Sequence, residues 1–363
     1  MHVPRALRVL FLVPYPADRA PGQRYRVEQW VRLLGDGAVE ATFRPLFDRE
    51  AYEVLYRPGH LGRKAVAVLD GLGRRIADTV RVTRHDVVVL YREAFPIGPA
   101  IIERLVERRM PVVYDFDDAI FLGDTSRANR MFSALKQPRK VEQIVAGAAA
   151  TTVSNEWLAA WARDHSSRVV VIPPTVDLTQ HRPMARPPGT RVRIGWSGSP
   201  TTAAHLHTID GALRRVLASR EVELVVVGAP DYGLPGAANV VVRRWSPAAE
   251  VADLASFDIG VMPLPDDAWS RGKAGMKALL SMAMATPVVV SPIGANTDIV
   301  QDGVNGRHAG NEDEWVAVLE ELVDDAALRR RLGQAGRATV EDRFSGQRWA
   351  PVFLDVLRAA ADR

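Results

Sequence analysis

The 363-residue sequence contains no cysteine. This absence excludes disulfide frameworks, thiolate metal sites and cysteine nucleophiles, and it is compatible with a reducing compartment. No run of residues approaches the roughly 18 apolar positions that a membrane-spanning helix requires. The short apolar run near the N-terminus ends in prolines and does not have the pattern of a targeting segment. We therefore expect a soluble, cytoplasmic protein.

Signature motifs of several large enzyme classes are also missing. The first predicted strand, residues 8–14, is followed by Tyr15–Ala20, where a dinucleotide dehydrogenase would have a G-x-G-x-x-G turn. The sequence has no G-x-x-x-x-G-K-[ST] loop, no H-E-x-x-H pair and no G-x-S-x-G elbow. These absences argue against dehydrogenases, P-loop enzymes, zinc proteases and α/β-hydrolases.

Basic residues are present in slight excess and are concentrated in one segment. The chain has 47 Lys and Arg against 43 Asp and Glu, a net charge of +4, and most of the excess lies in residues 57–84. The same segment has a helical stripe of apolar residues: Leu61, Ala65, Val68, Leu69, Leu72, Ile76 and Val80. Arg63, Arg74 and Arg81 lie on the opposite face.

This basic amphipathic helix has two interpretations. In the commoner one, the apolar stripe faces the core and the basic back is solvated. In the other, the segment 57–84 makes weak peripheral contact with anionic lipid on the inner membrane face, or binds an acidic acceptor. We do not expect nucleic-acid binding, because the basic face lacks interleaved aromatic residues.

Short Val-rich runs alternate with helical patterns along the whole chain. In the first half, strands are predicted at 8–14, 39–47, 86–91, 111–114, 151–154 and 169–172. A proline-rich stretch, 173–190, follows. The second half repeats the rhythm with strands at 192–196, 223–227, 240–242, 259–262 and 288–291. The pattern predicts an α/β fold of two doubly wound parallel sheets.

The proline-rich stretch and the last helix divide the chain into three parts. We expect an N-terminal domain of residues 1–185 and a C-terminal domain of residues 186–345. A final helix, 346–361, begins the last part, 346–363, and we expect it to pack back on the N-terminal domain.

The strongest chemical feature is the run Trp269–Lys277 (WSRGKAGMK), which follows the predicted strand 259–262. A helix is predicted over 274–285, so that Lys273 and Lys277 would lie four residues apart on one helical face. Glycines at 272 and 275 allow close backbone approach, and the helix N-terminus favours negative charge. The run predicts an anion site at the carboxyl end of a strand; the alternative is a solvated basic loop.

Three carboxylates, Asp115, Asp117 and Asp118, follow the predicted strand 111–114 and should project from its carboxyl end. Mutual repulsion can raise the pKa of one of them toward a useful general-base value, or the group can attract a cation. The alternative is helix capping and solvated loop charge. We do not expect a metal site, since no His or further acidic ligand stands nearby in the sequence.

With these residues in view, the chain resembles the family 4 glycosyltransferases. The run 271–303 is similar to their carboxy-terminal domain, and further similar segments are Ile194–Pro200 (IGWSGSP), Val225–Gly228 (VVVG), Phe257–Leu264 (FDIGVMPL), Tyr114–Phe121 (YDFDDAIF) and Val171–Leu178 (VIPPTVDL). The resemblance implies the GT-B fold, two Rossmann-like domains that face each other across a cleft. It also implies transfer of a sugar from a nucleoside-diphosphate sugar to an acceptor hydroxyl, with retention of configuration and without a metal or other cofactor.

The resemblance assigns roles to individual residues. The C-terminal domain would bind the donor through Gly198, Ser199, Trp245, Gly272, Ala274, Gly275, Lys277 and Ser281, with Trp245 stacking on the base. Arg271 and Lys273 would stabilise the leaving diphosphate, and Asp117 would contact the transferred sugar. Arg24, Arg26, Asp115 and Asp118 would bind the acceptor; for the two arginines, surface charge is an equal alternative.

The sequence also departs from the family. Its usual pair of glutamates, eight positions apart, is replaced by Gly272 and Leu280. Ser281 is adjacent and would take over the ribose contact. The run Gly272–Lys277 (GKAGMK) fits a branch of the family that has Gly-Lys-x-Gly-x-Lys in place of the first glutamate. Two alternatives therefore stay open, a catalytically silent GT-B subunit that binds a sugar or partner, and a sugar-nucleotide epimerase.

Overall fold

The structure is a computed structural model that describes residues 5–35, 37–55, 59–123, 137, 139–184 and 191–363. The chain divides into two compact units. Unit 1 comprises Met1–Pro173 and Gly346–Arg363, and unit 2 comprises Pro174–Ser345. The units thus divide at Pro173, earlier than the boundary at residue 185 that we expected.

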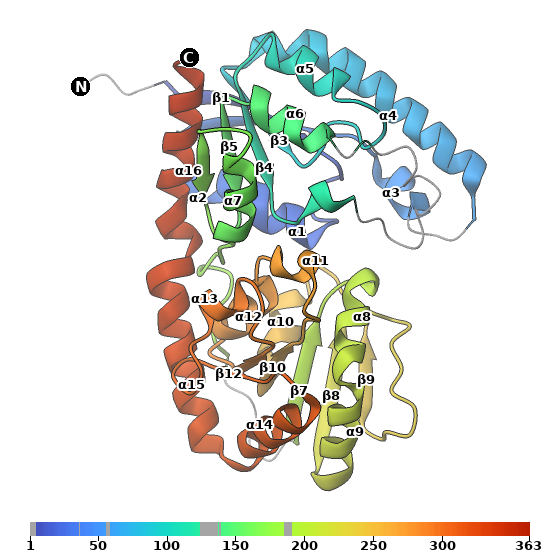
Figure 1. The fold of residues 1–363 in the computed structure, drawn as a ribbon, viewed down its shortest axis with the longest axis vertical. Helices are drawn as coiled ribbons and strands as arrows, with labels where there is room; N and C mark the ends of the chain where they lie inside the picture. Colours follow the sequence, from blue (N-terminus) through green and yellow to red (C-terminus); the bar gives the residue numbers. More distant parts are fainter. Residues whose placement is uncertain (1–4, 36, 56–58, 124–136, 138, 185–190) are drawn as a thin grey trace. The chain divides into compact units, whose positions relative to one another are not determined.

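Unit 1 is built on a six-stranded, all-parallel sheet with the order β2-β1-β3-β4-β5-β6. Figure 1 labels four of these strands, β1, β3, β4 and β5. Its strands are β1 (Leu7–Val13), β2 (Val39–Pro45), β3 (Val87–Tyr91), β4 (Val112–Phe116), β5 (Ala150–Val153) and β6 (Val169–Val171). Its helices are α1 (Pro21–Gln23), α2 (Gln29–Leu34), α3 (Arg49–Leu55), α4 (Leu61–Arg81), α5 (Ile101–Glu107), α6 (Lys140–Gly147), α7 (Glu156–Arg163) and α16 (Gly346–Ala361). Central strands β3 and β4 are buried throughout, as their Val-rich sequences predict.

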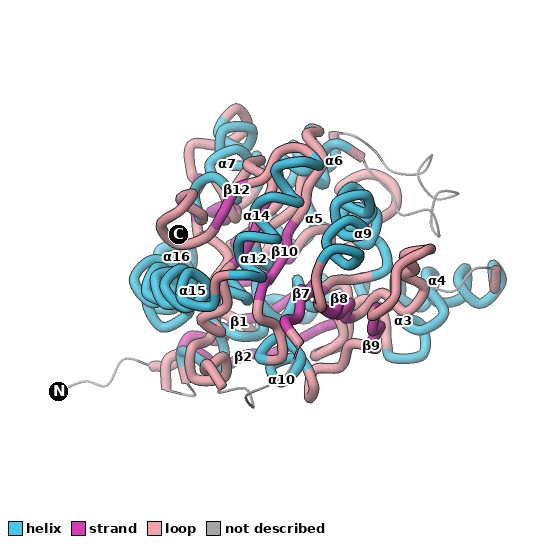
Figure 2. The backbone as a smooth tube through the Cα atoms, turned by 90° about the horizontal axis from the view of Figure 1, so that it is seen from below, coloured by secondary structure: helices cyan, strands magenta, loops and turns pink. Residues whose placement is uncertain are grey.

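Unit 2 is also built on an all-parallel six-stranded sheet, with the order β12-β11-β10-β7-β8-β9. Figure 2 shows β10, β7, β8 and β9 in this order. The strands are β7 (Val192–Ser197), β8 (Val222–Val227), β9 (Val240–Arg243), β10 (Ile259–Met262), β11 (Val288–Val290) and β12 (Arg307–His308). The helices are α8 (Ala203–Leu206), α9 (Asp210–Ser219), α10 (Glu250–Ala255), α11 (Ala268–Arg271), α12 (Met276–Ala283), α13 (Asn296–Ile299), α14 (Glu312–Asp324) and α15 (Ala326–Thr339). The α/β class with two doubly wound sheets is confirmed.

The final helix α16 belongs to unit 1 although it follows unit 2 in the sequence. It packs on α2, β3 and β4. The rings of Phe353 on α16 and Trp30 on α2 stack with their centroids 5.3 Å apart, and both side chains are buried. The apolar stripe of α16 therefore completes the core of unit 1.

Helix α4 differs from the more common of the two sequence interpretations. Its buried face carries Lys64, Gly71, Arg75, Asp78 and Thr79, whereas much of its apolar stripe is exposed. Arg75 is fully buried and donates hydrogen bonds to the carbonyl oxygens of Val13, Arg44 and Ala94 and to the carboxylate of Asp78. The helix is thus attached to the sheet by polar contacts. Carbonyl oxygens near or beyond the strand ends accept the hydrogen bonds of the buried Arg75 guanidinium.

A carboxyl group between α5 and α6 predicts a pH dependence of stability. Glu107 lies against Gly147, and its Oε1 atom is buried without a hydrogen-bond partner among the described residues. Burial, reinforced by Glu103, raises the pKa of Glu107 from 4.5 to about 7. The folded state therefore binds more protons than the unfolded state between these values, and the stability of the fold falls as pH rises through this window.

We expect Glu107→Gln to stabilise the protein by about 1–2 kcal/mol at pH 8 and by little at pH 5, because the amide has no proton to lose. Thermal unfolding at the two pH values measures the difference. Glu103→Gln is the contrasting control. Glu103 is buried and ion-paired with Lys140 at 3.0 Å, so its neutralisation should destabilise the protein at both pH values. Equal effects of Glu107→Gln at both pH values would contradict the assignment.

Candidate functional site

The carboxyl ends of β7 and β10 form the topological switch point of unit 2. Strand β7 comes first in the chain and is flanked by β8 on one side and β10 on the other. Crossover connections leave in opposite directions from such a point, which is where doubly wound sheets bind ligands. Gly198 and Ser199 directly follow β7, and the segment 263–275 connects β10 to α12.

Lys277, in the first turn of α12, lies at this switch point. Its Nζ atom is 5.5 Å from the centroid of the Trp196 ring on β7. A Cβ atom added to Gly198 would lie 2.8 Å from Lys277 Cε and 2.5 Å from the Trp196 ring. The lysine stem therefore fits between a buried indole ring and a glycine, and any side chain at position 198 would displace it.

Lys273 lies outside helix α12, which corrects the prediction that it shares a helical face with Lys277. The helix begins at Met276 with Gly275 as its N-cap, whereas we expected a start at Ala274. Lys273 is in the connection, with Nζ 5.0 Å from the ring centroid of Trp269. The two lysines therefore do not share a helical face, and each is placed over a different indole ring.

An additional helical turn, α11, places the preceding residues. The side chain of Asp267 accepts a hydrogen bond from the backbone N–H of Ser270 and begins the turn, and Gly272 ends it. Arg271 is half-exposed and pairs with Asp266 at 2.9 Å. The cation that we assigned to the diphosphate is thus partly compensated by a neighbouring carboxylate.

Gly275 has a backbone conformation that favours glycine, with φ +76°. A Cβ atom there would collide with Ile299. The Oδ1 atom of buried Asn296 lies 3.7 Å from the same position and has no hydrogen-bond partner among the described residues. The start of α12 is therefore packed tightly and has a buried polar atom beside it.

Ser281, the residue predicted to contact the ribose, lies on α12. It is buried on the sheet side of α12, where its hydroxyl group lies against Gly260 of β10. Leu280 is also buried. The side chain that we expected to replace the missing second glutamate thus fills the contact between α12 and the sheet.

Trp245 lies next to the switch point, on the β8 side. Its indole N–H donates to the buried carboxylate of Glu250 at 3.0 Å. Gly228, at the end of β8, has φ +87°, and a Cβ atom there would collide with the carbonyl oxygen of Gly198 and lie 3.2 Å from Trp245 Cβ. The loops after β7, β8 and β9 therefore meet at Gly198, Gly228 and Trp245.

Ser199 takes part in a capping box with Thr202 at the turn Pro200–Thr202. The backbone N–H of Ser199 donates to Thr202 Oγ1 at 3.1 Å, and its hydroxyl lies 2.8 Å from that of Thr201. The capping box fixes the chain direction after β7.

In unit 1, Asp117 and Asp118 lie beyond the carboxyl end of β4 and share one arginine. Arg92 Nη2 contacts Asp117 Oδ1 at 2.9 Å and Asp118 Oδ2 at 2.8 Å, and Tyr91 donates its hydroxyl to Asp117 Oδ1 at 3.0 Å. The other oxygen of Asp117 lies 3.4 Å from a Cβ position at Gly22. Burial by itself would lower the pKa of Arg92, but these carboxylates raise it above its ordinary value.

Arg92 has φ +61°, an uncommon backbone conformation for a residue with a side chain. Such conformations persist where the surroundings hold them, and they occur often at functional sites. The backbone N–H of Arg92 donates to the carbonyl oxygen of Asp115 at 2.7 Å, which helps to hold it.

Arg26 and Asp115 form a buried ion pair away from solvent. Both side chains are 3% exposed; Arg26 Nε donates to Asp115 Oδ1 at 3.0 Å, and Thr152 donates to Asp115 Oδ2 at 2.6 Å. Arg26 also donates to the carbonyl oxygen of Ile172. Burial raises the pKa of Asp115, and Arg26 counteracts this. The alternative of surface charge is wrong for Arg26, and the pair connects the turn before α2 to β4 and to the end of β6.

Arg24 is also buried. It pairs with Asp18 at 3.4 Å, and its guanidinium lies 5.6 Å from the ring centroid of Tyr25. We expected the three carboxylates around Asp117 to repel one another. Two arginines offset this repulsion: Arg26 pairs with Asp115, and Arg92 pairs with Asp117 and Asp118.

Four residues of the site were not predicted as site residues from the sequence: Tyr91, Arg92, Trp196 and Gly228. Tyr91 is the last residue of β3 and Arg92 follows it, so position after a strand was a usable signal for both. Trp196 faces the core within β7, and only its contact with Lys277 shows its part in the site.

Among the described residues, no three His, Cys, Asp or Glu side chains gather closely enough to hold a metal ion. No helix in the described part of the chain is long and apolar enough to cross a bilayer.

Comparison with known proteins connects unit 2 to one family. Residues 191–325 match the family model described as "Glycosyl transferases group 1". A relative named D-inositol 3-phosphate glycosyltransferase from Paenarthrobacter aurescens (strain TC1) is 31% identical over 169 residues, which cover 41% of this chain and 39% of the relative. A relative of the same name from Nocardioides sp. is 28% identical over 281 residues, covering 67% of this chain and 59% of the relative. The chain thus spans only part of the length of these relatives.

Solved structures share the fold of nearly the whole chain. Sucrose-phosphate synthase from Thermosynechococcus elongatus superposes with a TM-score of 0.71 at 14% identity, covering 98% of both chains. The Anabaena protein HepE, solved in complex with UDP and glucose, superposes with a TM-score of 0.67 at 14% identity, covering 97% of this chain and 99% of HepE. The α/β fold with two parallel, Rossmann-like sheets that the resemblance implied is confirmed.

Proposed function

We propose that this chain, whose residues 191–325 form a glycosyl transferases group 1 domain, is a retaining glycosyltransferase that moves a sugar from a nucleoside-diphosphate sugar to an acceptor hydroxyl. The observation that carries the proposal is the position of Lys277. A lysine in the first turn of a helix, at the switch point of a doubly wound sheet and beside a glycine loop, is suited to bind a diphosphate.

The donor would bind with its diphosphate between the Gly198–Ser199 loop and the start of α12. Lys277 would contact the phosphate oxygens directly, and Lys273 and Arg271 would add positive charge from the connection before the helix. The backbone of Gly272, Ala274 and Gly275 would lie against the donor. Trp245, which is half-buried beside Gly228, would stack on the base.

In the reaction, the bond between the anomeric carbon and the diphosphate oxygen breaks, and the acceptor oxygen forms a new bond to that carbon. The nucleoside diphosphate leaves with the electron pair, and the acceptor proton passes to a base. Lys277 and Lys273 would stabilise the charge that grows on the leaving group, which is electrostatic preorganisation. Retention follows from attack on the face of departure or from a short-lived covalent intermediate; both remain in the proposal.

Unit 1 would bind the acceptor around Asp117 and Asp118, with Asp117 contacting the transferred sugar. Tyr91 and Arg92 both donate to Asp117 Oδ1 and hold its carboxylate in one orientation. Arg24 is a further candidate for acceptor contact. Arg26 and Asp115, which satisfy each other in the interior, would act by positioning the chain around the site.

Replacing Asp117 with Asn should lower turnover by about 10²-fold or more, a far larger effect than the fall in melting temperature, because Arg92 keeps its ion pair with Asp118 at 2.8 Å when the Asp117 charge is removed. Steady-state transfer rates and thermal unfolding measure the two effects. Asp164→Asn, an exposed residue in the same unit, is the matched control. Loss of folding in step with loss of activity would show that the Asp117 cluster is structural.

A donor assay tests the proposed function as a whole. The full chain is incubated with UDP-, GDP-, ADP- and dTDP-sugars, with and without a panel of hydroxyl acceptors that includes inositol phosphates, the class in the names of the relatives. We expect release of one nucleoside diphosphate that increases with one acceptor. The anomeric configuration of the product, read by NMR, tests retention.

The same assay distinguishes the alternatives. The replacement of both family glutamates, by Gly272 and Leu280, favours a silent binding subunit, which would bind a nucleotide without releasing it. An epimerase would interconvert donors without transfer. Either outcome would overturn the proposal.

A further inference from the structure

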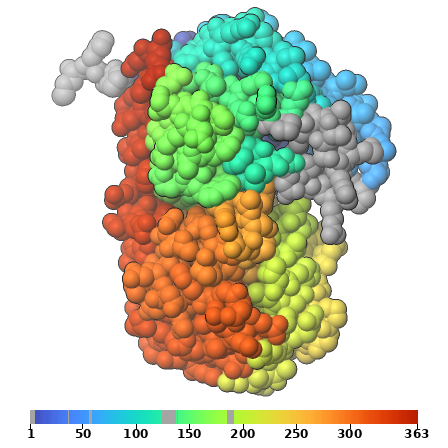
Figure 3. All heavy atoms as spheres, in the orientation of Figure 1, coloured from blue at the N-terminus to red at the C-terminus, as the bar shows by residue number. Residues whose placement is uncertain are grey.

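Helix α4 exposes a row of large apolar side chains on unit 1. Five large apolar side chains on this helix are more than half exposed: Leu61 at 55%, Val66 at 58%, Leu69 at 66%, Ile76 at 54% and Val80 at 70%. Positions 66, 69, 76 and 80 follow a helical spacing, so that their side chains share one face. The helix, light blue in the space-filling view, lies at the surface of its unit (Figure 3). Single exposed apolar residues are ordinary, but an aligned row of them marks an interaction surface.

The exposure of this row follows from the way in which α4 is attached to its unit. The buried Arg75 and Asp78 turn one polar face of the helix toward the sheet, where Arg75 donates to three carbonyl oxygens. Gly71 lies so close to Leu46 that a Cβ atom would approach it to 2.9 Å. These contacts fix the rotation of the helix, so the apolar row cannot turn inward without breaking them.

Basic side chains flank the apolar row. Arg63, Arg81 and Arg84 are exposed and form no ion pair with any other described residue. Arg74 pairs with Asp48 at 2.6 Å. The one exposed carboxylate on the helix is Asp70. The border of the apolar row is therefore positively charged.

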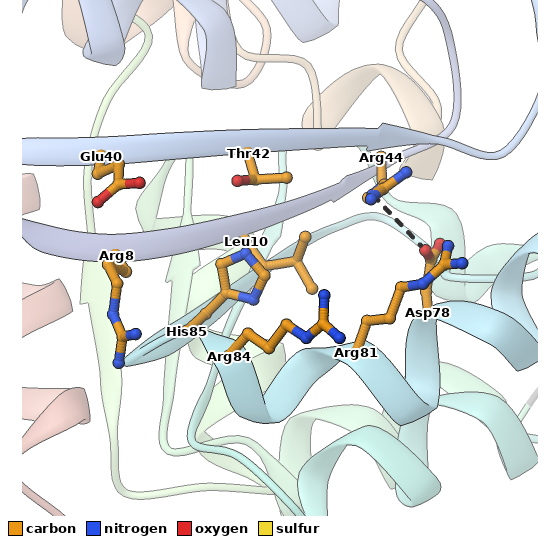
Figure 4. A pocket seen from close by; sticks show the side chains of 9 residues that line it. All are labelled: Arg8, Leu10, Glu40, Thr42, Arg44, Asp78, Arg81, Arg84 and His85. Atoms are coloured by element: carbon orange, nitrogen blue, oxygen red, sulfur yellow. Dashed lines mark ion pairs between the residues drawn. The ribbon is translucent and has the colours of Figure 1, made fainter.

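A basic pocket adjoins the C-terminal end of the row. Its volume is about 310 Å³, and it is lined by the end of α4 with the turn after it, by β1 and by the edge strand β2 (Figure 4). The lining residues are Arg8, Leu10, Glu40, Thr42, Arg44, Asp78, Arg81, Arg84 and His85.

Two of the cations in this pocket are already paired and two are not. Arg8 pairs with Asp86 at 2.8 Å, and Arg44 lies 3.8 Å from Asp78. Arg81 and Arg84 are left with positive charge that the described carboxylates do not neutralise. The pocket thus has four arginines against the two carboxylates of Glu40 and Asp78, and its volume of about 310 Å³ can hold a small anionic group.

We propose that this surface, the α4 row with its arginine border and basic pocket, docks unit 1 on an anionic lipid bilayer. The apolar row would enter the interface between headgroups and acyl chains, and Arg81 and Arg84 would contact lipid phosphates at the pocket. An apolar strip bordered by basic residues is the arrangement that binds such membranes. A second copy of the chain fits less well, because a symmetric contact through α4 would bring the arginine borders of both copies together.

Vesicle cosedimentation with the full-length chain tests the proposal. The probes are vesicles of phosphatidylcholine with 30% phosphatidylglycerol and vesicles of phosphatidylcholine alone, at ~0.05 M and ~0.5 M salt. We expect binding to the anionic vesicles at low salt, with a loss of about tenfold or more at high salt or without the anionic lipid, since charge attraction at the surface is screened. No nucleotide sugar is present, so the result is independent of the proposed transfer activity.

Two variants separate the apolar and the charged contributions. Leu69→Asn with Val80→Asn removes apolar surface, and Arg81→Glu with Arg84→Glu reverses the charge. Each should weaken binding by about tenfold or more, while thermal unfolding stays near that of the wild type because these side chains are exposed. The matched controls on unit 2 are Val304→Asn with Met184→Asn and Arg244→Glu with Arg330→Glu, all at exposed positions, and they should bind as the wild type does.

Wild-type protein that stays in the supernatant with anionic vesicles at low salt would overturn the proposal. Equal binding by both α4 variants and their controls would also overturn it, because attraction would then come from another surface. If light scattering instead shows a dimer that Leu69→Asn with Val80→Asn dissociates, without vesicle binding, the occupant of the surface is a second copy and not a membrane.

Discussion

Lys277→Met should reduce the turnover of glycosyl transfer by about 10²-fold, the scale on which single contacts to developing charge act. Methionine keeps an unbranched stem that can remain over the Trp196 ring beside Gly198, so the substitution removes the charge with little change in packing. Affinity for a nucleoside diphosphate should fall, whereas affinity for the nucleoside alone should change much less. Titration calorimetry with UDP and uridine, followed by the GDP, ADP and dTDP series, measures this.

Lys273→Met tests the second lysine separately, because the structure places it over Trp269 in the connection and not on α12. We expect turnover and nucleoside diphosphate affinity to fall about as much as in Lys277→Met. Arg330→Met, an exposed cation on α15 of the same unit, is the matched control and should have wild-type affinity. Unchanged diphosphate binding in both lysine variants would show that the anion site lies elsewhere.

Arg26→Met should cost about 3–5 kcal/mol of folding free energy, because it leaves the Asp115 carboxylate buried without its counter-charge. For a unit of this size, a melting temperature lower by on the order of 10 °C is expected. Arg32→Met, an exposed arginine on α2, should change it little. Thermal unfolding followed by circular dichroism makes the comparison.

The pH dependence of this variant separates an electrostatic cause from lost packing. Without Arg26, burial alone acts on the pKa of Asp115 and raises it, so the folded variant takes up a proton that the unfolded chain releases. The stability deficit of Arg26→Met should therefore be smaller at pH 5 than at pH 7.5. Asp115→Leu added to Arg26→Met should recover part of the deficit at pH 7.5, because no buried charge remains. A deficit that is equal at both pH values and unaffected by Asp115→Leu would point to packing.

The buried ion pairs also explain why some predicted site residues can reach a ligand and others cannot. The resemblance placed Arg26 and Asp115 together in the acceptor site, and the two residues are indeed in contact. They nevertheless face each other and Thr152 inside the unit. Sequence position identifies residues near a site, but burial and partners decide which of them can reach a ligand.

The positions of Ser281 and Arg92 have a similar explanation. Ser281 is adjacent in sequence to the position of a family glutamate, but a step of one residue on a helix rotates the side chain by about 100°. That rotation directs its hydroxyl at Gly260 of the sheet. Arg92 directly follows β3, and it holds Asp117 and Asp118 because β3 and β4 are adjacent in the sheet.

The two parallel sheets could be predicted from the sequence, because short Val-rich strands alternating with helices have few other ways to bury their side chains. The sequence also placed the glycine-lysine run 272–277 after a strand of unit 2. Three features became known only from the folded structure: the start of α12, the position of Lys277 over Trp196, and the buried face of α4. The helical spacing of apolar residues in a sequence predicts that a helix has an apolar side. Which side packs inward depends on distant partners, here the carbonyl oxygens of Val13, Arg44 and Ala94 that accept from Arg75.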